Sequence, residues 1–286
     1  MKHQLLLAED LSCAGQVSLS VGLSILGASG CEPTCLPTTL LSTHTGGFGT
    51  PARFDLSGMM TAIISHWQHI PLEFDQIYLG YLGQEAIDVV IKELPRVFSK
   101  KHQLLLDPAM ADNGRFYRGF DLRYAIKMRE LVTQADLVTP NVTEACLLLD
   151  RPLVAKLDLP AAKRLISDLQ EKFPSVSWLL TGVSEGEDIV VLGLFSDQTS
   201  PKVWHASRVP GNFMGTGDVF ASLIMAGRYY EVPLPVLIPE AMSAITQMLQ
   251  ETSQASSRDS RLGPIYNEAL LTFCQKLATW RNNECD

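Results

Sequence analysis

The sequence predicts an α/β domain in which helices cover both faces of a mostly parallel sheet. Short apolar runs recur along the chain in the way that buried parallel strands do. Segments with helical spacing separate these runs, which gives the alternation of a doubly covered sheet. After residue 181 two strand-like segments follow each other directly, so we expect an antiparallel edge. Because no repeat or long linker divides the chain, we expect a single domain over residues 1–286.

The expected elements follow in order from this alternation. The apolar runs predict parallel strands at residues 4–8, 74–79, 103–106, 137–139 and 178–181, and an antiparallel pair at 188–195 and 202–208. The helical spacings predict helices at residues 16–26, 57–69, 84–98, 121–133, 142–149, 161–173, 216–229, 235–251 and 265–280. Ser57 and Asp121 are expected N-caps, because their side-chain oxygens can accept a hydrogen bond from a free backbone N–H group. Residues 252–264, rich in Ser and Arg, are expected to form an exposed loop.

Composition and charge exclude several classes of protein. The chain has 23 basic and 31 acidic residues, a net charge of −8, and its hydrophobic fraction of 46% excludes disorder as the main state. The acidity and the absence of a basic run argue against binding to nucleic acid or to anionic membranes. The apolar run at residues 5–8 is too short for a signal peptide, and no run reaches the about 20 residues of a membrane span. We expect a cytoplasmic protein.

The six cysteines lack the C-x-x-C spacing of zinc and redox sites. We therefore expect them to be buried thiols. Cys13, which lies near a predicted site, is expected to be a small packed thiol as well.

Polar, acidic and glycine residues follow the predicted parallel strands. These residues are 9–12 after the first strand, 80–83 after the second, and then Asp107, Asn141 and Gly182. Parallel sheets bind their ligands at the carboxyl ends of the strands, next to helix N-termini. The sequence therefore predicts a site at this edge.

The sharpest motif is the segment GNFMGTGDVF at residues 211–220, which runs directly into an apolar helix. Gly215 and Gly217 flank Thr216, so the backbone can turn tightly and aim its N–H groups at an anion. Asp218 then stands where a carboxylate can accept the proton of a hydroxyl that attacks this anion. A purely structural alternative remains open, in which Asp218 only complements the helix dipole.

Other phosphate-handling and hydrolytic motifs are absent. No Walker A sequence occurs, and the third glycine of a Rossmann fingerprint is replaced by Phe220. The HRD and DFG motifs of protein kinases and the H-E-x-x-H motif of metalloproteases are missing too. What remains is a nucleotide-handling fold with a G-x-G-D anion hole.

Several motifs together resemble the ribokinase superfamily and, more closely, its pyridoxal kinase branch. They are GTGD at 215–218, TPN-x-x-E at 139–144, DP at 107–108, GYLG at 80–83 and S-x-HT at 42–45. The resemblance implies a ribokinase-like three-layer fold and an ATP-dependent kinase that phosphorylates the hydroxymethyl group of vitamin B6 compounds. It also implies Mg²⁺ and a homodimer, and it leaves open whether a monovalent cation such as K⁺ is required.

The resemblance also implies a role for individual residues. Asp218 is the catalytic base, and Gly215, Thr216 and Gly217 stabilise the transferred phosphoryl group and contact ATP. The positions that contact the pyridine ring are Ser12, Thr45 and Tyr81. Asp107 and Glu144 lie near magnesium, where Glu144 can act through water. The other residues that contact the nucleotide are Asp112, Tyr117, Thr139, Asn141, Thr181 and Gly182, and residues 108–117 match a flap that closes over ATP.

Three other functions remain as alternatives. A hydroxymethylpyrimidine kinase shares the fold and uses a similar primary alcohol. A non-catalytic protein that binds B6 or a nucleotide is disfavoured, because a pure binder has no need of a base beside an anion hole. A dinucleotide-dependent oxidoreductase suits the fold class but not the motifs.

Overall fold

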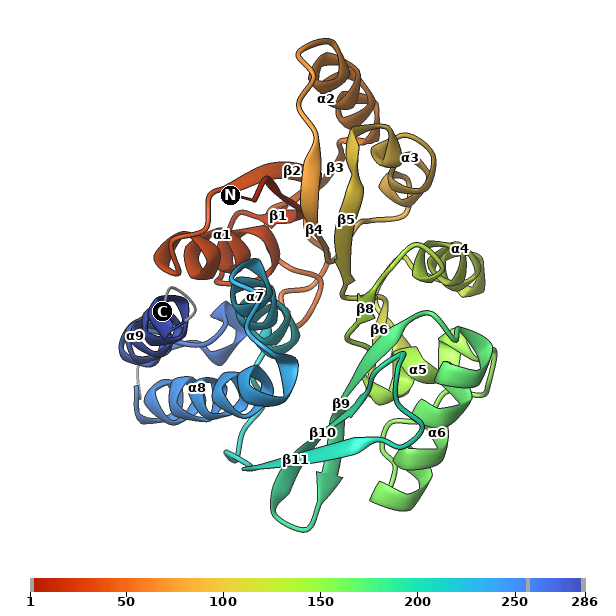
Figure 1. Cartoon of the computed structure of the whole chain (residues 1–286). Helices are drawn as coiled ribbons and strands as arrows, with labels where there is room; N and C mark the ends of the chain where they lie inside the picture. The colour runs from red at the N-terminus through yellow and green to blue at the C-terminus, as the bar shows by residue number, and fades with distance from the viewer. Residues whose placement is uncertain (1–2, 256–257, 284–286) are drawn as a thin grey trace.

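The computed structural model describes residues 3–255 and 258–283 and contains a nine-stranded sheet of order β11-β10-β9-β8-β5-β4-β1-β2-β3 (Figure 1). The parallel pairs are formed by β1 (Leu5–Ser12), β2 (Pro33–Leu41), β4 (Phe74–Leu79), β5 (Phe98–Leu106), β8 (Leu137–Val138) and β9 (Ser177–Glu185). Both edges are antiparallel, with β3 (Arg53–Asp55) at one and β10 (Asp188–Leu194) with β11 (Lys202–Ser207) at the other. The short strands β6 (Ala111–Asp112) and β7 (Arg115–Phe116) form a separate hairpin.

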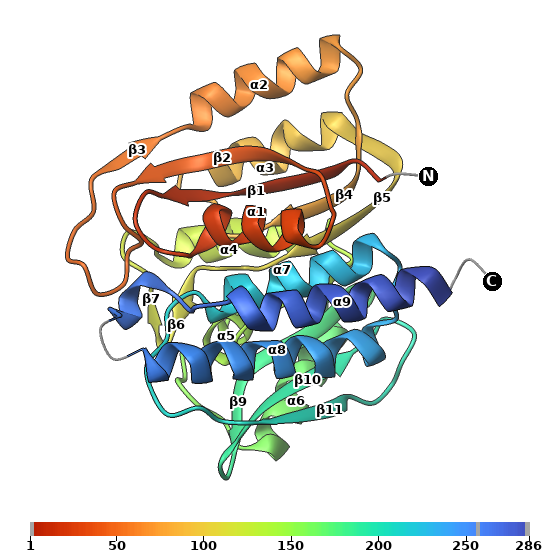
Figure 2. The ribbon, with the colours of Figure 1, turned by 90° about the vertical axis from the view of Figure 1, so that its left-hand side faces the viewer.

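Helices cover both faces of the sheet (Figures 1 and 2). One face carries α2 (Ser57–His69), α3 (Ala86–Lys92), η1 (Leu94–Val97), α4 (Leu122–Val132), α5 (Val142–Leu148) and α6 (Leu159–Lys172). The other face carries α1 (Ser18–Ala28), α7 (Thr216–Tyr229), α8 (Leu234–Gln254) and α9 (Asn267–Asn283), while η2 (Ser260–Leu262) precedes α9.

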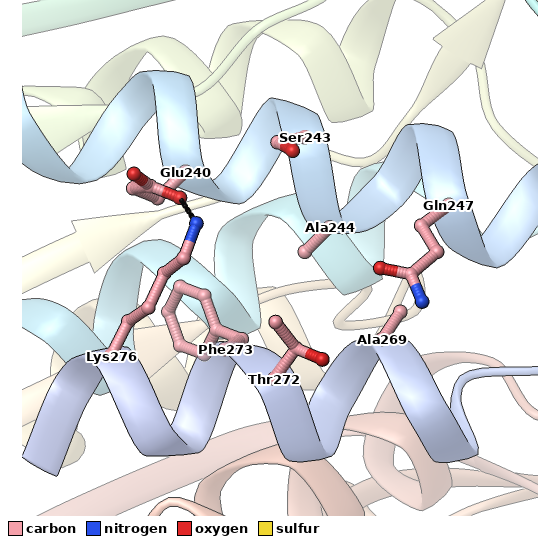
Figure 3. Close-up of a pocket in the computed structure, with 8 residues that line it drawn as sticks. All are labelled: Glu240, Ser243, Ala244, Gln247, Ala269, Thr272, Phe273 and Lys276. Atoms are coloured by element: carbon pink, nitrogen blue, oxygen red, sulfur yellow. Dashed lines mark hydrogen bonds and ion pairs between the residues drawn. The ribbon is translucent and has the colours of Figure 1, made fainter.

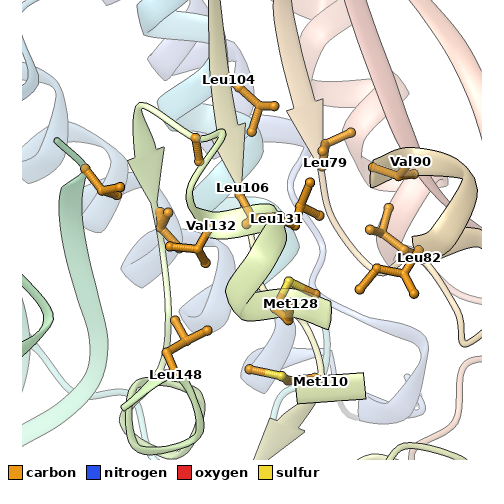
Figure 4. Packing of buried hydrophobic residues seen from close by; sticks show 14 of the residues in the cluster. Leu79, Leu82, Val90, Leu104, Leu106, Met110, Met128, Leu131, Val132 and Leu148 are labelled. Atoms are coloured by element: carbon orange, nitrogen blue, oxygen red, sulfur yellow. The ribbon is translucent and has the colours of Figure 1, made fainter. Parts of the chain in front are cut away.

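The core is divided by the sheet into two clusters, as the alternation of side chains along a strand requires. In β1, Leu5 and Leu7 are buried under α1 and α7, whereas Leu6 and Ala8 belong to the opposite cluster. Figure 4 shows this opposite cluster, in which leucines of β4 and β5 meet Met128 and Leu131 of α4. Burial on both faces explains why the central strands are apolar without alternation.

The predicted alternation is confirmed, with several corrections. α2, α7 and β4 have the predicted bounds, and β1 continues beyond residue 8 to Ser12. The predicted helix 84–98 is instead α3, η1 and the start of β5, because Pro95 has no N–H group to continue the helix. Asp121 caps α4 as predicted.

Two strands and one cap were predicted wrongly. β2 and β3 were missed, because the prolines and threonines of β2 hide its apolar residues and β3 has three residues. Ser57 is not an N-cap: it starts α2, and the side chain of Asp55 accepts hydrogen bonds from its N–H and hydroxyl groups at 3.1 and 2.6 Å.

Further corrections concern the cysteines and the last loop. Cys31 and Cys146 are buried and Cys274 is half-buried, but Cys13 and Cys35 are exposed, so these two are not packed thiols. Cys285 lies outside the described residues. The expected loop 252–264 is partly helical and partly buried: α8 extends into it, η2 lies within it, and Gly263 is covered. In the described part of the chain, no helix has the length and apolar character required to cross a bilayer.

Candidate active site

The predicted site residues gather at the carboxyl edge of the parallel strands. Asp107 directly follows β5 and Thr139 follows β8, while Asn141 forms an isolated bridge with Thr181 of β9. The β6–β7 hairpin lies at this same edge, to which β1 points in Figure 2. The first turn of α7 also faces this edge, so the sheet topology joins motifs that are far apart in sequence.

Asp218 is held at the start of α7 with one carboxylate oxygen engaged. Gly215 precedes the helix with φ +79°, a left-handed conformation in which a side chain would also approach Val17 to 2.8 Å. The backbone N–H of Ser18 donates to Oδ2 of Asp218 at 2.7 Å. Burial raises the pKa of Asp218, while the hydrogen bond from Ser18 and the nearby His44 lower it. A half-buried carboxylate of raised pKa is suited to accept a proton.

Asp107 is buried opposite the glycine turn of residues 215–217 at the start of α7, which we call the anion loop. A side chain at Gly217 would lie 3.7 Å from Oδ2 of Asp107. Burial, and secondarily the charge of Asp218, raise the pKa of Asp107 well above its usual range. No hydrogen bond from the described residues reaches its carboxylate, although the side chain is only 6% exposed. A cation beside a phosphate would supply the missing positive charge, so Asp107 fits the predicted magnesium site.

Glu144 is also buried but its two oxygens are occupied. Oε1 accepts a hydrogen bond from the N–H of Met110 at 3.1 Å, and Oε2 accepts one from the N–H of Asn141 at 2.9 Å. The side chain of Asn141 accepts the N–H of Glu144 in return at 3.0 Å, which completes a capping box on α5. The predicted role of Glu144 at magnesium therefore rests on the resemblance alone, and no cluster of three potential ligand residues occurs among the described His, Cys, Asp and Glu side chains.

The hairpin that matches the predicted flap is tied to α5. The side-chain amide of Asn141 donates to the carbonyl of Ala111 at 2.8 Å, and the N–H of Gly114 donates to the hydroxyl of Thr143 at 2.9 Å. Asp112 is exposed on this hairpin, whereas Tyr117 after it is half-buried, and burial raises the pKa of its phenol well above the usual range. The structure thus places Asp112, which follows Ala111, near Asn141, while the N–H of Tyr117 donates to the carbonyl of Met110 at 2.9 Å at the base of the same hairpin.

Thr139, Thr181 and Gly182 complete this side. The N–H of Thr181 donates to the carbonyl of Pro140 at 2.9 Å. Gly182 has φ +73°, and a side chain there would lie 3.7 Å from Asn141. The hydroxyl of Thr139 is buried without a partner among the described residues, so it is available to a ligand.

The predicted ring-binding residues lie on the first strand and on two loops. The hydroxyl of Ser12 donates to Asp10 at 2.8 Å, and the N–H of Asp10 donates to the carbonyl of Tyr81 at 2.9 Å. The ring of Tyr81 lies 5.0 Å from that of Phe120. Thr45 is half-buried in the loop between β2 and β3. Asp10 therefore connects two of the three predicted residues.

Glu9 and Asp10 were not assigned a role from the sequence. Burial raises the pKa of Asp10 to about 7, against the opposing hydrogen bonds from Ser18 and Ser12. Neither oxygen of Glu9 has a partner among the described residues, and a side chain at Gly80 would fall 2.0 Å from one of them. Both acids directly follow the apolar run of residues 5–8, and this position is the signal in the sequence that could have found them.

A groove between α8 and α9 is separate from this site (Figure 3). It is lined by Glu240, Ser243, Ala244, Gln247, Ala269, Thr272, Phe273 and Lys276. Its cavity of about 20 Å³ accommodates about one water molecule, and Lys276 pairs with Glu240 across it. It contains none of the predicted site residues.

Comparison with known proteins decides the family. The sequence model of the phosphomethylpyrimidine kinase family matches residues 28–263. The chain belongs to this family. The ribokinase-like α/β fold that the motifs implied is confirmed, and so is the assignment to the pyridoxal kinase branch.

Three solved structures illustrate the relationship. A pyridoxal kinase from Lactobacillus plantarum is 33% identical, with a TM-score of 0.88 over 96% of this chain and 98% of that one. A Bacteroides thetaiotaomicron protein, named as a phosphomethylpyrimidine kinase and solved with pyridoxal, is 30% identical, with a TM-score of 0.87 over 96% of both chains. A Leishmania donovani pyridoxal kinase in complex with ADP and pyridoxamine is 20% identical, with a TM-score of 0.81 over 96% of both chains, and shares the fold.

Curated relatives from Schizosaccharomyces pombe and Caenorhabditis elegans also carry the name pyridoxal kinase. They are 24% and 26% identical to this chain. The aligned region spans 58% and 48% of their length.

Proposed function

We propose that this kinase transfers the γ-phosphoryl group of ATP to the 5′-hydroxymethyl group of a vitamin B6 compound. The substrates would be pyridoxal, pyridoxine and pyridoxamine, as in salvage of pyridoxal 5′-phosphate, with the activity of EC 2.7.1.35. The pyridoxal and ADP in the related structures support this substrate pair. The observation that carries the proposal is the placement of Asp218 at the start of α7, where its raised pKa suits a base beside the anion loop.

The proposed reaction uses residues of three segments. Asp218 accepts the proton of the substrate hydroxymethyl group while the oxygen of that group forms a bond to the γ-phosphorus. The bond from this phosphorus to the bridging oxygen breaks, and ADP leaves. The backbone N–H groups of residues 215–217 stabilise the charge on the transferred phosphoryl group.

Magnesium is part of the proposal. When bound, Mg²⁺ would neutralise charge on the phosphate oxygens of ATP. Asp107 would hold it, because this carboxylate is buried next to the anion loop without a donor, and Glu144 would act through water. Asn141, Thr139, Thr181, Gly182, Asp112 and Tyr117 would surround the nucleotide, while Ser12, Thr45 and Tyr81 would contact the ring.

The decisive experiment is an ADP-release assay with Mg-ATP and each B6 alcohol, comparing the wild type with Asp218→Asn. General-base catalysis contributes about 10²- to 10⁴-fold, so we expect kcat to fall by about 10³-fold while the variant still folds. Asp197→Asn is the control, since Asp197 is exposed in the turn between β10 and β11. Turnover of Asp218→Asn near that of the wild type would disprove the assignment of the base.

A hydroxymethylpyrimidine kinase is the second candidate, because the matching family is named for a pyrimidine substrate. The same assay with hydroxymethylpyrimidine gives a specificity constant for each alcohol. A higher specificity constant for hydroxymethylpyrimidine than for the B6 alcohols would support a hydroxymethylpyrimidine kinase of thiamine synthesis. Binding of pyridoxal without any ATP consumption would instead support a non-catalytic protein.

The remaining expectations belong to the same proposal. We propose that residues 1–286 act as a single domain, in a cytoplasmic homodimer with small-molecule substrates and without nucleic-acid or membrane partners. Sedimentation velocity tests the dimer. Repeating the assay in Na⁺ and K⁺ buffers tests the monovalent cation.

A further inference from the structure

A short segment before α9, residues 259–263, lies against two parts of the candidate site, and we call it the strap. It contains η2 and Arg261, and α7 and α8 separate it in sequence from the glycine turn at Gly215. Figure 2 shows it at the edge where the loop between β2 and β3 turns back. The strap therefore joins the C-terminal helices to the substrate side of the proposed reaction.

The guanidinium of Arg261 makes two contacts with the loop of residues 43–50, which contains His44. Its own carboxylate partner is Asp259, which accepts from Nε at 2.9 Å and from Nη2 at 2.7 Å. Nη1 donates to the carbonyl of Gly47 at 2.9 Å, and the guanidinium lies 4.4 Å from the ring centre of Phe48. The two hydrogen bonds to Asp259 fix the orientation of the planar guanidinium group. This group is therefore already oriented for its contacts with Gly47 and Phe48.

His44 is held by the backbone of the same strap. Nε2 of His44 lies 2.6 Å from the carbonyl oxygen of Arg261, and Nδ1 lies 3.1 Å from the N–H of Gly46. A carbonyl accepts and an N–H donates, so Nε2 carries the proton and Nδ1 accepts. Thr45, the predicted ring-binding residue, follows directly in the chain and is positioned by these bonds.

The strap also holds the segment that supports Asp218. The N–H of Gln16 donates to the carbonyl of Leu262 at 2.7 Å, and its side chain accepts the hydroxyl of Tyr266 at 2.6 Å. Gly263 has φ +81°, and a side chain there would fall 2.3 Å from the carbonyl of Gln16. Ser18, two residues after Gln16, donates the hydrogen bond to Asp218.

We propose that Arg261 is a positioning residue for the alcohol substrate. It holds the loop of residues 43–50 in place, and this loop forms one wall of the pocket that binds the alcohol. This inference rests on the proposed function. ATP is predicted to lie on the other side, near α5 and the hairpin. Among the described residues the side chain of Arg261 contacts Asp259, Gly47 and Phe48 and none of that side, and the loop approaches it at its far end, where Arg118 donates to the hydroxyl of Thr50. Loss of Arg261 therefore affects recognition of the alcohol and leaves recognition of ATP intact.

The kinetic test compares Arg261→Ala with the wild type at varied alcohol and varied ATP. We expect KM for the B6 alcohol to rise at least about tenfold, because a charged hydrogen bond and a cation–π contact are lost together. KM for ATP should change less than about twofold, a difference near the scale of minor surface effects. Arg261→Lys keeps a positive charge but cannot make the paired hydrogen bonds that the guanidinium makes with Asp259. Its KM for the B6 alcohol should therefore lie between those of Arg261→Ala and the wild type. Equal rises in both KM values, or no rise in either, would overturn the proposal.

Arg123→Ala is the matched control. Arg123 pairs with Asp121 at the same spacing of two residues, through Nε at 3.0 Å and Nη2 at 2.8 Å, but it lies on α4. This variant should leave both KM values unchanged. If Arg261→Ala does not fold, Phe48→Leu keeps Arg261 but removes the ring that contacts its guanidinium and the ring of His44, and it should raise only KM for the alcohol.

A second readout separates this proposal from the proposed function. Hydrogen–deuterium exchange of the free protein should show faster exchange at residues 43–50 in Arg261→Ala and unchanged exchange there in Arg123→Ala. This readout needs no turnover. Inactivity of the wild type on every alcohol would disprove the proposed function. Unchanged exchange at residues 43–50 in Arg261→Ala would instead disprove that Arg261 holds this loop.

Discussion

Two buried carboxylates at the same sheet edge, Asp107 and Glu144, have opposite surroundings. Burial raises the pKa of both well above their usual ranges. Glu144 accepts hydrogen bonds from the backbone of Met110 and Asn141, so it joins α5 to the hairpin. Asp107 receives no hydrogen bond from the described residues and faces the anion loop. An acid that is satisfied by its own chain serves the structure, whereas an acid without donors is suited to a ligand.

Asp218 and Asp10 fall between these two cases. Asp218 accepts hydrogen bonds from one residue, Ser18, whose backbone N–H fixes the direction of the carboxylate. Asp10 accepts hydrogen bonds from two hydroxyl groups, and burial raises its pKa to about 7. The number of donors around each acid therefore predicts what its removal will change, either turnover or stability.

The largest expected effect is that of Asp107→Asn on turnover. This change removes the charge that would hold magnesium, so we expect kcat to fall by about 10³-fold, the upper range for one electrostatic group in a transition state. The variant should also need more Mg²⁺ for half-maximal activity. Magnesium titrations of the ADP-release assay measure both effects.

The stability of the same variant sharpens the comparison. Since no donor loses its acceptor, Asp107→Asn should unfold in urea at a midpoint equal to or higher than that of the wild type. Asp197→Asn serves again as the exposed control. If Asp107→Asn loses stability but keeps the magnesium requirement of the wild type, Asp107 stabilises the fold, as Glu144 does, and does not bind the metal.

The central layers could be predicted from the sequence because burial on both faces leaves a simple apolar pattern. The run at residues 74–79 and the helix at 216–229 have the predicted bounds for this reason. The edge strands β2 and β3 could not be found in the same way. Their polar composition is typical of loops, and only the pairing of β2 with β1 and of β3 with β2 makes them strands.

The site was predictable where one segment carries the chemistry. Gly215 and Asp218 are close in sequence, and the left-handed turn and the position of the acid follow from the motif itself. The donor on Asp218 comes from Ser18, 200 residues away, and no local pattern shows this contact. The same holds for Arg261, which contacts Gly47 across 214 residues, and so its loop was wrongly expected to be simply exposed.

The second expected effect is a change of stability with pH in Asp10→Asn. In the wild type the folded pKa of about 7 exceeds the unfolded value of 3.8, so the folded protein binds more protons between these values. The contribution of Asp10 is therefore fully present below pH 3.8 and is lost as the pH rises to about 7. A shift of about 3 pKa units corresponds to at most about 4 kcal/mol in the free energy of unfolding.

Urea unfolding at several pH values measures this difference. The stability of Asp10→Asn relative to the wild type should increase from pH 4 to pH 7 and then remain constant. The constant offset between the two proteins reports the hydrogen bonds that the amide keeps with Ser12 and Ser18. A pH-independent difference would show that Asp10 is already ionised in the folded protein at low pH.

The smallest expected effect belongs to Glu144→Gln, and it falls on stability. The amide keeps one acceptor oxygen but turns an N–H group toward a backbone N–H, either that of Met110 or that of Asn141. Losing one such bond to a buried donor costs about 2 kcal/mol in the free energy of unfolding. Urea midpoints measure this loss, and Glu130→Gln, on the exposed side of α4, is the control.

The activity of Glu144→Gln then shows whether Glu144 only stabilises the structure or also acts at the metal. If Glu144 serves only to join α5 and the hairpin, KM for ATP should rise as the hairpin loosens, while the magnesium requirement stays that of the wild type. A higher magnesium requirement with unchanged stability would instead show that Glu144 acts at the metal through water. Glu144 would then share the role of Asp107 at the metal, and its hydrogen bonds from the backbone of Met110 and Asn141 would orient a functional group rather than only hold the flap.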